Sequence, residues 1–180
     1  ERLIAAHEAT GAAATVLTMQ PDNPYGYGRI VRDESGNVCG IVEEKDCTDE
    51  QRAIGECNSG VFCFSAPALL SHLDKLDRNN AQGEYYLTDM LALLAADGLT
   101  VSSMVVADND ECLGVNSRSQ LAAASKIAQR RINDGLMAAG VTMLDPDLVW
   151  VGPDCVVEND VELLPMTMLW GTTRVSSGCT

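Results

Sequence analysis

Positive charge and histidine are both scarce in this 180-residue chain, and each shortage excludes a class of protein. Lysine and arginine together number 12 against 26 aspartates and glutamates, so the net charge is −14. A surface of that sign repels the phosphate backbone, and we therefore expect no nucleic acid as a partner. Only two histidines are present and no two cysteines form a C-x-x-C pair, which argues against a zinc site.

Long apolar runs are also missing. No stretch approaches the length that spans a membrane, and we find no signal peptide, so we expect no membrane partner. The seven cysteines are an odd number and several lie in apolar runs, which predicts reduced thiols and a cytoplasmic location. The chain begins at Glu1 inside a helical pattern and ends at Thr180 inside a repeat, so we expect a fragment with two cut ends.

Hydrophobic residues make up 46% of the chain, and before residue 118 their spacing alternates between helical and extended patterns. The helical patterns cover residues 2–9, 67–76 and 88–96, and the strand patterns cover residues 14–19, 29–32, 38–43, 59–64 and 100–106. Thr88 is placed to cap the third of these helices, and Gly98 is placed to end it. Strands and helices mixed in this order predict an α/β domain.

A long helix is predicted next, capped by Ser117 and ended by Gly140, and we interpret it as a linker between two domains. From Val149 onward the residues fall into sixes: VWVGPD, CVVEND, VELLPM, TMLWGT and TRVSSG. A fixed period of six predicts a parallel β-helix, in which each run supplies one short strand and its third residue points into the core. These apolar third positions are Val151, Val157, Leu163, Leu169 and Val175.

Three positions suit the binding of a polar ligand. Gly28, in the sequence YGYGRI, would let the backbone approach a ligand closely, although a tight turn accounts for the same pattern. Glu43 ends an apolar strand, where its carboxylate could accept hydrogen bonds from sugar hydroxyls, or it could be a surface charge. Asn58 opens the next strand, and its amide suits a sugar ring with an N-acetyl group, or it could begin the strand as a turn residue.

Two further segments carry candidates. The loop NNAQGEYYLTD, residues 79–89, holds more amides, aromatic rings and acids than a connection requires, and we weigh a binding role evenly against a plain connection. Glu84 and Tyr86 in this loop, with Tyr27 in the glycine-rich turn, are added as substrate-binding candidates. Asn116, just before the long helix, could ligate a metal through its side-chain oxygen or could cap the helix.

Taken in order, these stretches carry a family resemblance. PYGYGRI, GIVEEKDCTDEQR, ECNSG, NNAQGEYYLTD, GVNSRSQL and AGVTMLDP follow one another as in a known group of enzymes, and hexapeptide repeats come after them. Over nearly its whole length the chain resembles the bacterial bifunctional N-acetylglucosamine-1-phosphate uridyltransferases and glucosamine-1-phosphate acetyltransferases.

The resemblance implies both a fold and a function. Residues 1–118 would be the C-terminal part of a Rossmann-like uridylyltransferase domain, residues 119–140 a linker helix, and residues 141–180 the start of a left-handed β-helix. The family joins UTP and N-acetylglucosamine 1-phosphate into UDP-N-acetylglucosamine, releases pyrophosphate, and assembles as a homotrimer through its β-helix.

The resemblance also implies roles for single residues. Gly28, Glu43, Asn58 and Asn116 match positions that contact the sugar nucleotide, and the Asn116 position also binds Mg²⁺ together with an aspartate. Nothing in these 180 residues matches that aspartate, the glycine-rich phosphate loop, the phosphate-binding lysine, the uracil-binding segment or the acetyltransferase residues. Because Mg²⁺ usually needs at least one carboxylate besides substrate phosphates, we expect no catalytic residue in this chain and no activity from it alone.

Two alternatives stay open. The chain could belong to a nucleotidyltransferase for another hexose 1-phosphate, although Asn58 and the loop over residues 79–89 favour the N-acetylated sugar. It could also be a non-catalytic subunit, for sugar-nucleotide binding or assembly, that keeps the sugar pocket and the β-helix.

Overall fold

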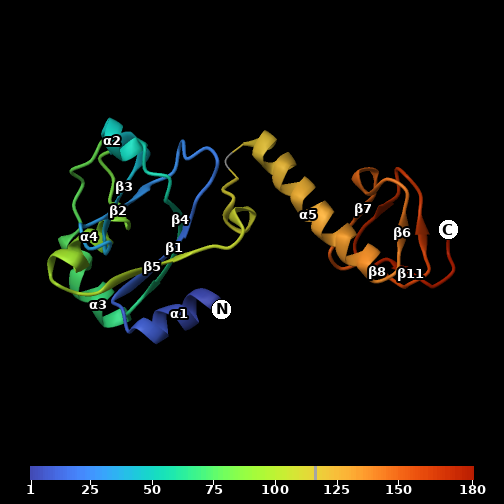
Figure 1. Ribbon diagram of the computed structural model, residues 1–180, viewed down its shortest axis with the longest axis horizontal. Coiled ribbons are helices and arrows are strands. Elements are labelled where there is room, and N and C mark those ends of the chain that lie inside the picture. Colours follow the sequence, from blue (N-terminus) through green and yellow to red (C-terminus); the bar gives the residue numbers. More distant parts are fainter. Residues whose placement is uncertain (116) are drawn as a thin grey trace. The chain divides into compact units, whose positions relative to one another are not determined.

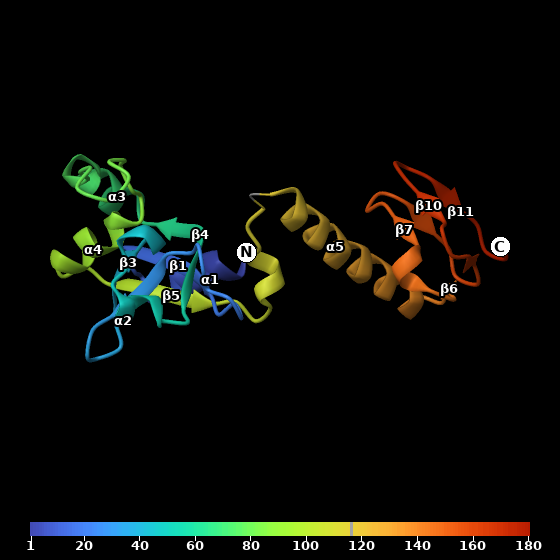
Figure 2. The ribbon, with the colours of Figure 1, turned by 90° about the horizontal axis from the view of Figure 1, so that it is seen from above.

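The computed structural model describes residues 1–115 and 117–180, which form two compact units, Glu1–Leu113 and Gly114–Thr180. Figures 1 and 2 show the ribbon in two perpendicular views. Each unit has a hydrophobic core of its own. Of the candidate residues, Asn116 alone lies outside the described residues, so its predicted role as ligand or cap stays a prediction.

A five-stranded mixed sheet forms the first unit, in the order β3-β2-β4-β1-β5. The strands are β1 (Ala14–Met19), β2 (Arg29–Arg32), β3 (Val38–Val42), β4 (Cys57–Phe64) and β5 (Val101–Val105). The pair β1 and β5 is parallel, and the other pairs are antiparallel. With the helices beside it, this sheet confirms the predicted α/β class.

The helices of the first unit follow the predicted patterns with two differences. They are α1 (Arg2–Thr10), α2 (Asp49–Arg52), α3 (Ala66–His72) and α4 (Asp89–Ala96), with 3-10 turns η1 (Glu44–Asp46), η2 (Leu73–Lys75) and η3 (Asn109–Cys112). The helix predicted over residues 67–76 ends at His72 and tightens into η2. The short α2 was not predicted, and a reciprocal capping box between Thr48 and Gln51 holds its first turn.

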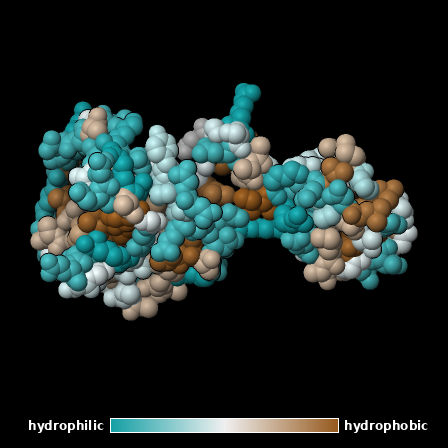
Figure 3. Space-filling model, turned by 45° about the horizontal axis from the view of Figure 1, so that its top comes forward, coloured by the Kyte–Doolittle hydropathy of each residue, from teal (hydrophilic) through white to brown (hydrophobic). Residues whose placement is uncertain are grey.

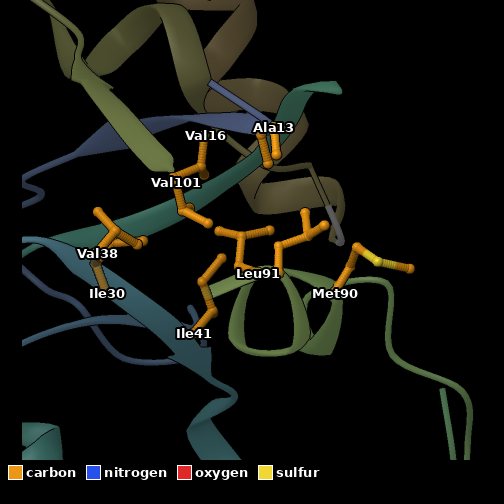
Figure 4. Close-up of a cluster of buried hydrophobic side chains, with 10 residues drawn as sticks. Ala13, Val16, Ile30, Val38, Ile41, Met90, Leu91 and Val101 are labelled. Carbon is orange, nitrogen blue, oxygen red and sulfur yellow. The ribbon is translucent and has the colours of Figure 1, made fainter. Parts of the chain in front are cut away.

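Helix α4 supplies the centre of the core (Figure 4). Met90, Leu91 and Leu94 are completely buried, and they pack in one cluster with Val16 of β1 and Ile41 of β3. Burying a side chain of this size contributes about 1.5–3 kcal/mol. Three such residues therefore fix the start of α4 against the sheet, and the start of α4 is where the polar loop over residues 79–89 ends.

Helix α1 covers the other face of the sheet. Its His7 Nδ1 lies 2.9 Å from the hydroxyl of Thr15 on β1. Successive strand residues point to opposite faces, and the neighbouring Val16 faces the α4 cluster. The sheet is thus enclosed between α1 on one side and α4 on the other.

The second unit begins with α5 (Arg118–Ala138) and continues in very short strands. These are β6 (Thr142–Met143), β7 (Trp150–Val151), β8 (Val156–Val157), β9 (Glu162–Leu163), β10 (Met168–Leu169) and β11 (Arg174–Val175), with the 3-10 turn η4 (Pro146–Leu148) between β6 and β7. The strands pair in parallel, β7 with β10, β8 with β11 and β6 with β9. Trp150 lies opposite Met168, so this register spans 18 residues, which is three six-residue repeats.

The period of six organises the interior of this unit. All five third-position residues belong to one hydrophobic cluster, together with first-position residues such as Val149 and Val161. In three of the five repeats the chain turns at the sixth position, where Asp160, Met166 and Gly178 have φ of 59°, 70° and 78°. Only glycine adopts such values without strain. Figure 3 shows apolar side chains that interrupt the hydrophilic surface of this unit.

Buried polar side chains fasten α5 to the strands. Asn133, with no exposed surface, donates from Nδ2 to the carbonyls of Pro146 and Val149 at 2.8 and 2.9 Å. Gln129, one turn earlier, donates to the Asp147 carbonyl at 3.1 Å. These carbonyls surround η4, where buried backbone acceptors need donors. The helix that the sequence suggested as a linker is therefore packed into the second unit as part of it.

Two smaller findings concern the cysteines and membranes. All seven cysteines are free thiols, and burial raises the pKa of the Cys47, Cys57 and Cys112 thiols above the ordinary value. Within residues 1–115 and 117–180, no helix is long and apolar enough to cross a membrane.

Replacing Asn133 with alanine should lower the free energy of unfolding of the second unit by about 1–3 kcal/mol, because two buried carbonyls each lose a donor. Both tryptophans, Trp150 and Trp170, belong to this unit, so their fluorescence during urea unfolding reports on it. Asp134→Ala, at an exposed position of the same helix, is the matched control and should change the value by at most about 0.5 kcal/mol. Equal unfolding midpoints for both variants would contradict the role given to Asn133.

Candidate functional site

The carboxylate of Glu43 lies directly over the backbone of Gly28. Gly28 precedes β2 and Glu43 follows β3, and the pairing of Arg29 with Val42 brings the two residues opposite each other. A Cβ atom placed on Gly28 would lie 2.8 Å from Cγ2 of Ile41 and 3.3 Å from both carboxylate oxygens of Glu43. The position therefore requires glycine because of its neighbours, and the tight-turn interpretation does not account for this close approach.

Asn58 lies on the other side of Gly28. Its backbone N–H donates to the Gly28 carbonyl at 2.8 Å, and its side-chain Oδ1 accepts from the Gly60 N–H at 2.8 Å. The register between β1 and β4 shifts beside it, and Gly60 has φ of 81°. Such a bulge redirects neighbouring side chains. Gly28, Glu43 and Asn58, which the sequence singled out separately, are thus brought to one place.

A buried ion pair anchors the glycine-rich turn. Arg29 is 2% exposed, and its Nη2 lies 2.8 Å from Oε2 of Glu44. Arg29 also donates to the carbonyl of Tyr27, and the same Glu44 oxygen accepts from the Gly26 N–H at 3.2 Å. The turn that carries Tyr27 and Gly28 is therefore tied to the residue that follows Glu43.

This pairing controls the ionisation of Glu44. Desolvation by its surroundings pushes the pKa of the Glu44 carboxyl upward, but the hydrogen bonds from Arg29 and Gly26 and the charges of Arg29 and Arg52 together bring it below the usual value. Glu44 is thus held as a carboxylate, as the charge of a buried guanidinium requires.

Hydrogen bonds hold the polar loop over residues 79–89 against η1. Nζ of Lys45 donates to Oε1 of Gln82 at 2.8 Å, and Nε2 of Gln82 donates to the Tyr86 hydroxyl at 2.7 Å. The Ala81 N–H donates to a carboxylate oxygen of Asp46 at 2.8 Å. Two residues of η1 therefore hold the loop next to Glu43.

Within this loop, Glu84 and Tyr86 differ in their surroundings. The exposed Glu84 is held through its backbone, because its carbonyl accepts from Nδ2 of Asn80 at 2.6 Å and its N–H donates to Oδ1 of Asn80 at 3.2 Å. Tyr86 is half-buried, and its hydroxyl is held by Gln82. The Glu84 carboxylate therefore faces solvent, while the Tyr86 ring has a fixed place.

Thr88 and Asp89 close the loop. The Thr88 hydroxyl donates to Oε1 of Glu43 at 3.1 Å, which joins the loop to the candidate site. Burial raises the pKa of the Asp89 carboxyl, and the negative charges of Asp77 and Asp46 raise it further. The negative charges of Asp46 and Asp77 thus act on Asp89 where the loop meets η1. The hydrogen bond between Thr88 and Glu43 lies next to Asp89 in the chain.

Sequence reasoning missed the roles of four residues in this site. Arg29 directly precedes the apolar residues Ile30 and Val31 in a strand pattern. A charged residue next to apolar strand residues is the sequence signal that indicates a buried ion pair here. Lys45 and Gln82 meet across 37 positions of the chain, which no local pattern reveals. Thr88 was predicted to cap a helix, and its bond to Glu43 is visible only in three dimensions.

The described residues do not form a metal centre. Among residues 1–115 and 117–180, no group of three or more histidine, cysteine, aspartate or glutamate side chains is placed to hold a metal ion. A cavity of about 550 Å³ lies elsewhere in the first unit, between β3 and the end of α4, and is lined by Val38, Cys39, Ala92, Leu99 and Val101 among others. It contains none of the candidate residues.

Comparisons with known proteins match this chain to one family. A family model described as nucleotidyl transferase matches residues 1–150. A protein of Trichlorobacter lovleyi called bifunctional protein GlmU is 48% identical over 180 residues, which are 100% of this chain and 39% of that protein. The protein of the same name from Syntrophotalea carbinolica is 49% identical over 179 residues, 99% of this chain and 38% of that protein. The chain thus spans about two-fifths of the length of the curated relatives it matches.

A solved structure resembles the fold. The nucleoside-diphosphate-sugar pyrophosphorylase from Vibrio cholerae RC9 aligns with a TM-score of 0.51 at 14% identity, over 65% of this chain and 48% of that one. At this identity the likeness concerns the fold alone.

Gly28→Ala should destabilise the first unit by about 1–3 kcal/mol, because the new methyl group must displace Ile41 or the Glu43 carboxylate. Gly55→Ala is the matched control, since a Cβ there meets no atom within 4 Å and the variant should be neutral or slightly more stable. Urea unfolding followed by backbone amide NMR signals of residues 1–113 measures both. A neutral Gly28→Ala would show that the carboxylate does not need the glycine.

Glu44→Gln should destabilise the first unit at neutral pH, because it leaves the buried Arg29 without its counter-charge. A carboxyl whose folded-state pKa is lowered contributes stability above its unfolded value of about 4.3, and this contribution is lost as the pH falls through the folded-state pKa. The gap between variant and wild type should therefore stay constant from neutral pH to about pH 4.3 and narrow as the pH falls further toward the folded-state pKa. The same NMR experiment at several pH values tests this, with the exposed Glu34→Gln as control. A gap that stays constant below about pH 4.3 as well would contradict the pairing.

Proposed function

The chain belongs to the nucleotidyl transferase family, and on that premise we propose that it is the sugar-phosphate-binding part of an N-acetylglucosamine-1-phosphate uridyltransferase. The substrate of the complete enzyme would be N-acetylglucosamine 1-phosphate, which reacts with UTP to give UDP-N-acetylglucosamine and pyrophosphate.

The observation that carries this proposal is the approach of the Glu43 carboxylate to Gly28 beside Asn58. A bare backbone next to a fixed carboxylate fits a hydroxyl-rich sugar ring, because the backbone allows close approach and a sugar hydroxyl can donate to the carboxylate. The amide of Asn58 can both donate and accept, as an N-acetyl group requires. Tyr27, Glu84 and Tyr86 would complete the edge of the pocket, since η1 and Arg29 hold their loops near Glu43.

In this proposal the described residues bind and orient the sugar, and none of them performs chemistry. Phosphoryl transfer depends mainly on positioning and charge neutralisation. The resemblance assigns the charge neutralisation to a phosphate loop, a lysine and Mg²⁺. The described residues offer no acidic cluster for Mg²⁺, and Asn116, the position implied as its ligand, is not among them. They do not fit a metal site, and we assign no step to a metal.

The second unit would be the start of the left-handed β-helix that the resemblance implies, with the residues after 140 as its first coils. Parallel pairing across 18 residues supports this, because three six-residue repeats, each with one short strand, then complete one turn of a prism. The homotrimer and the acetyltransferase activity would belong to the complete protein. The long helix would join the two domains in sequence while packing on the second.

Binding of N-acetylglucosamine 1-phosphate to the 180-residue chain, measured by isothermal titration calorimetry, tests the proposal. We expect tighter binding of this ligand than of glucose 1-phosphate, because the acetamido group adds contacts to the pocket. Glu43→Ala and Asn58→Ala should each weaken binding roughly 5- to 30-fold, the equivalent of about 1–2 kcal/mol for lost hydrogen bonds. Glu34→Ala, exposed in the hairpin turn, should bind as the wild type does.

Two other outcomes would point elsewhere. Equal affinity for both sugar phosphates would favour a nucleotidyltransferase for another hexose phosphate. Pyrophosphate release by the purified chain with UTP, N-acetylglucosamine 1-phosphate and Mg²⁺ would contradict the proposal that this chain binds sugar without catalysing transfer.

A further inference from the structure

Thr88 stands where a helix cap is expected, but it does not act as one. It is the N-cap residue of α4, and threonine in that position usually accepts a hydrogen bond from a backbone N–H of the first turn. Here no side-chain cap bond is present, and the φ and ψ of Thr88 are −64° and −27°, which are helical rather than extended. The cap interaction that the sequence predicts is therefore absent at Thr88.

The hydroxyl of Thr88 is instead directed at Glu43. It donates to Oε1 at 3.1 Å, and Thr88 is only 8% exposed. The N–H groups of Asp89 and Met90, at the start of α4, donate to the carbonyls of Tyr86 and Leu87 at 3.2 and 3.1 Å. Since the backbone already satisfies these donors, the Thr88 hydroxyl is available to the Glu43 carboxylate, 45 positions earlier in the chain.

The hydrogen bond restricts the Glu43 side chain from one side while the Gly28 backbone restricts it from the other. Among the described residues, Thr88 is the hydrogen-bond partner of the Glu43 carboxylate, and it engages Oε1. The second oxygen, Oε2, lies as close to Gly28 as Oε1 does, at 3.3 Å from the place of a Cβ. A carboxylate has acceptor capacity at both oxygens, so Oε2 remains able to accept from a ligand.

The anchoring of Thr88 makes this restriction firm. Thr88 ends the loop that Lys45 and Asp46 hold through Gln82 and Ala81. It is followed by Met90 and Leu91, which are completely buried in the core. The residues before Thr88 are held by hydrogen bonds and the residues after it by burial in the core, so the backbone that carries the hydroxyl is fixed in place.

We propose that Thr88 is a positioning residue, whose hydroxyl holds the Glu43 carboxylate in the orientation that binds the sugar. This inference rests on the proposed function and deepens it, because it names the group that presets the sugar-binding carboxylate. A side chain ordered before binding loses less conformational entropy when the ligand arrives.

Two substitutions separate the hydroxyl from the shape of the side chain. Thr88→Val keeps the branched shape and removes the hydroxyl, whereas Thr88→Ser keeps the hydroxyl and removes a methyl group. By calorimetry with N-acetylglucosamine 1-phosphate, we expect Thr88→Val to bind about 5- to 30-fold more weakly than wild type and Thr88→Ser within about 3-fold of it. In the Glu43→Ala background, Thr88→Val should cause no further loss, because the group that it positions is gone.

A measurement without ligand tests the positioning directly. Three-bond NMR couplings of Glu43 in the free chain report its rotamer populations. We expect one dominant rotamer in wild type and Thr88→Ser, and an averaged distribution in Thr88→Val. Unchanged rotamers in Thr88→Val would overturn the inference whether or not the chain binds sugar.

The outcomes also separate this inference from the function on which it rests. If wild type fails to bind the sugar phosphate, the proposed function fails, and the rotamer measurement still decides the role of Thr88. If Glu43→Ala weakens binding while Thr88→Val binds like wild type, the function stands and the positioning role is wrong. Equally weak binding by Thr88→Ser and Thr88→Val would also overturn it, because the hydroxyl would then not be the cause.

Discussion

A guanidinium group cannot be buried without a counter-charge, and the pairing of Arg29 with Glu44 meets this requirement at the centre of the first unit. Arg29 begins β2 and Glu44 begins η1, so the pair fixes how the glycine-rich turn meets the end of β3. Because the pair fixes the turn against the end of β3, Glu43 approaches the backbone of Gly28. The pair also fixes the position of η1, whose residues hold the polar loop over residues 79–89. Removal of either partner would leave the other charge uncompensated, and at a buried position this is strongly destabilising.

The strands and the repeat were readable from the sequence because they depend on local periodicity. Apolar runs gave every strand of the first unit to within two residues, and the period of six gave the residues that form the core of the second. The docking of the long helix was not readable, because it depends on Gln129 and Asn133. Polar residues on a helix usually face solvent, and nothing local reveals that these two satisfy distant carbonyls.

The candidate site shows the same division. Gly28, Glu43 and Asn58 were identified singly, each with an ordinary alternative, because a motif shows which residue types are present and not which of them meet. For Gly28, the structure replaces the tight turn by a steric reason. Thr88 shows the limit of local rules most clearly. The capping preference of threonine correctly predicted that Thr88 is the N-cap residue of α4, but its hydroxyl donates to Glu43 and does not cap the helix.

The place of β1 in the sheet has a consequence for the order in which the protein can fold as it is made. β1 lies between β4 and β5, and Ala14 pairs with Val101, which follows it by 87 residues. At ribosomal rates of about 5–20 residues per second, β1 waits several seconds for its parallel neighbour. In the second unit, in contrast, two of the parallel pairs join residues 18 positions apart and the third joins residues 20 positions apart. Until β5 is made, the edge of β1 that β5 covers lacks its partner, although β4 is already present to pair with the other edge.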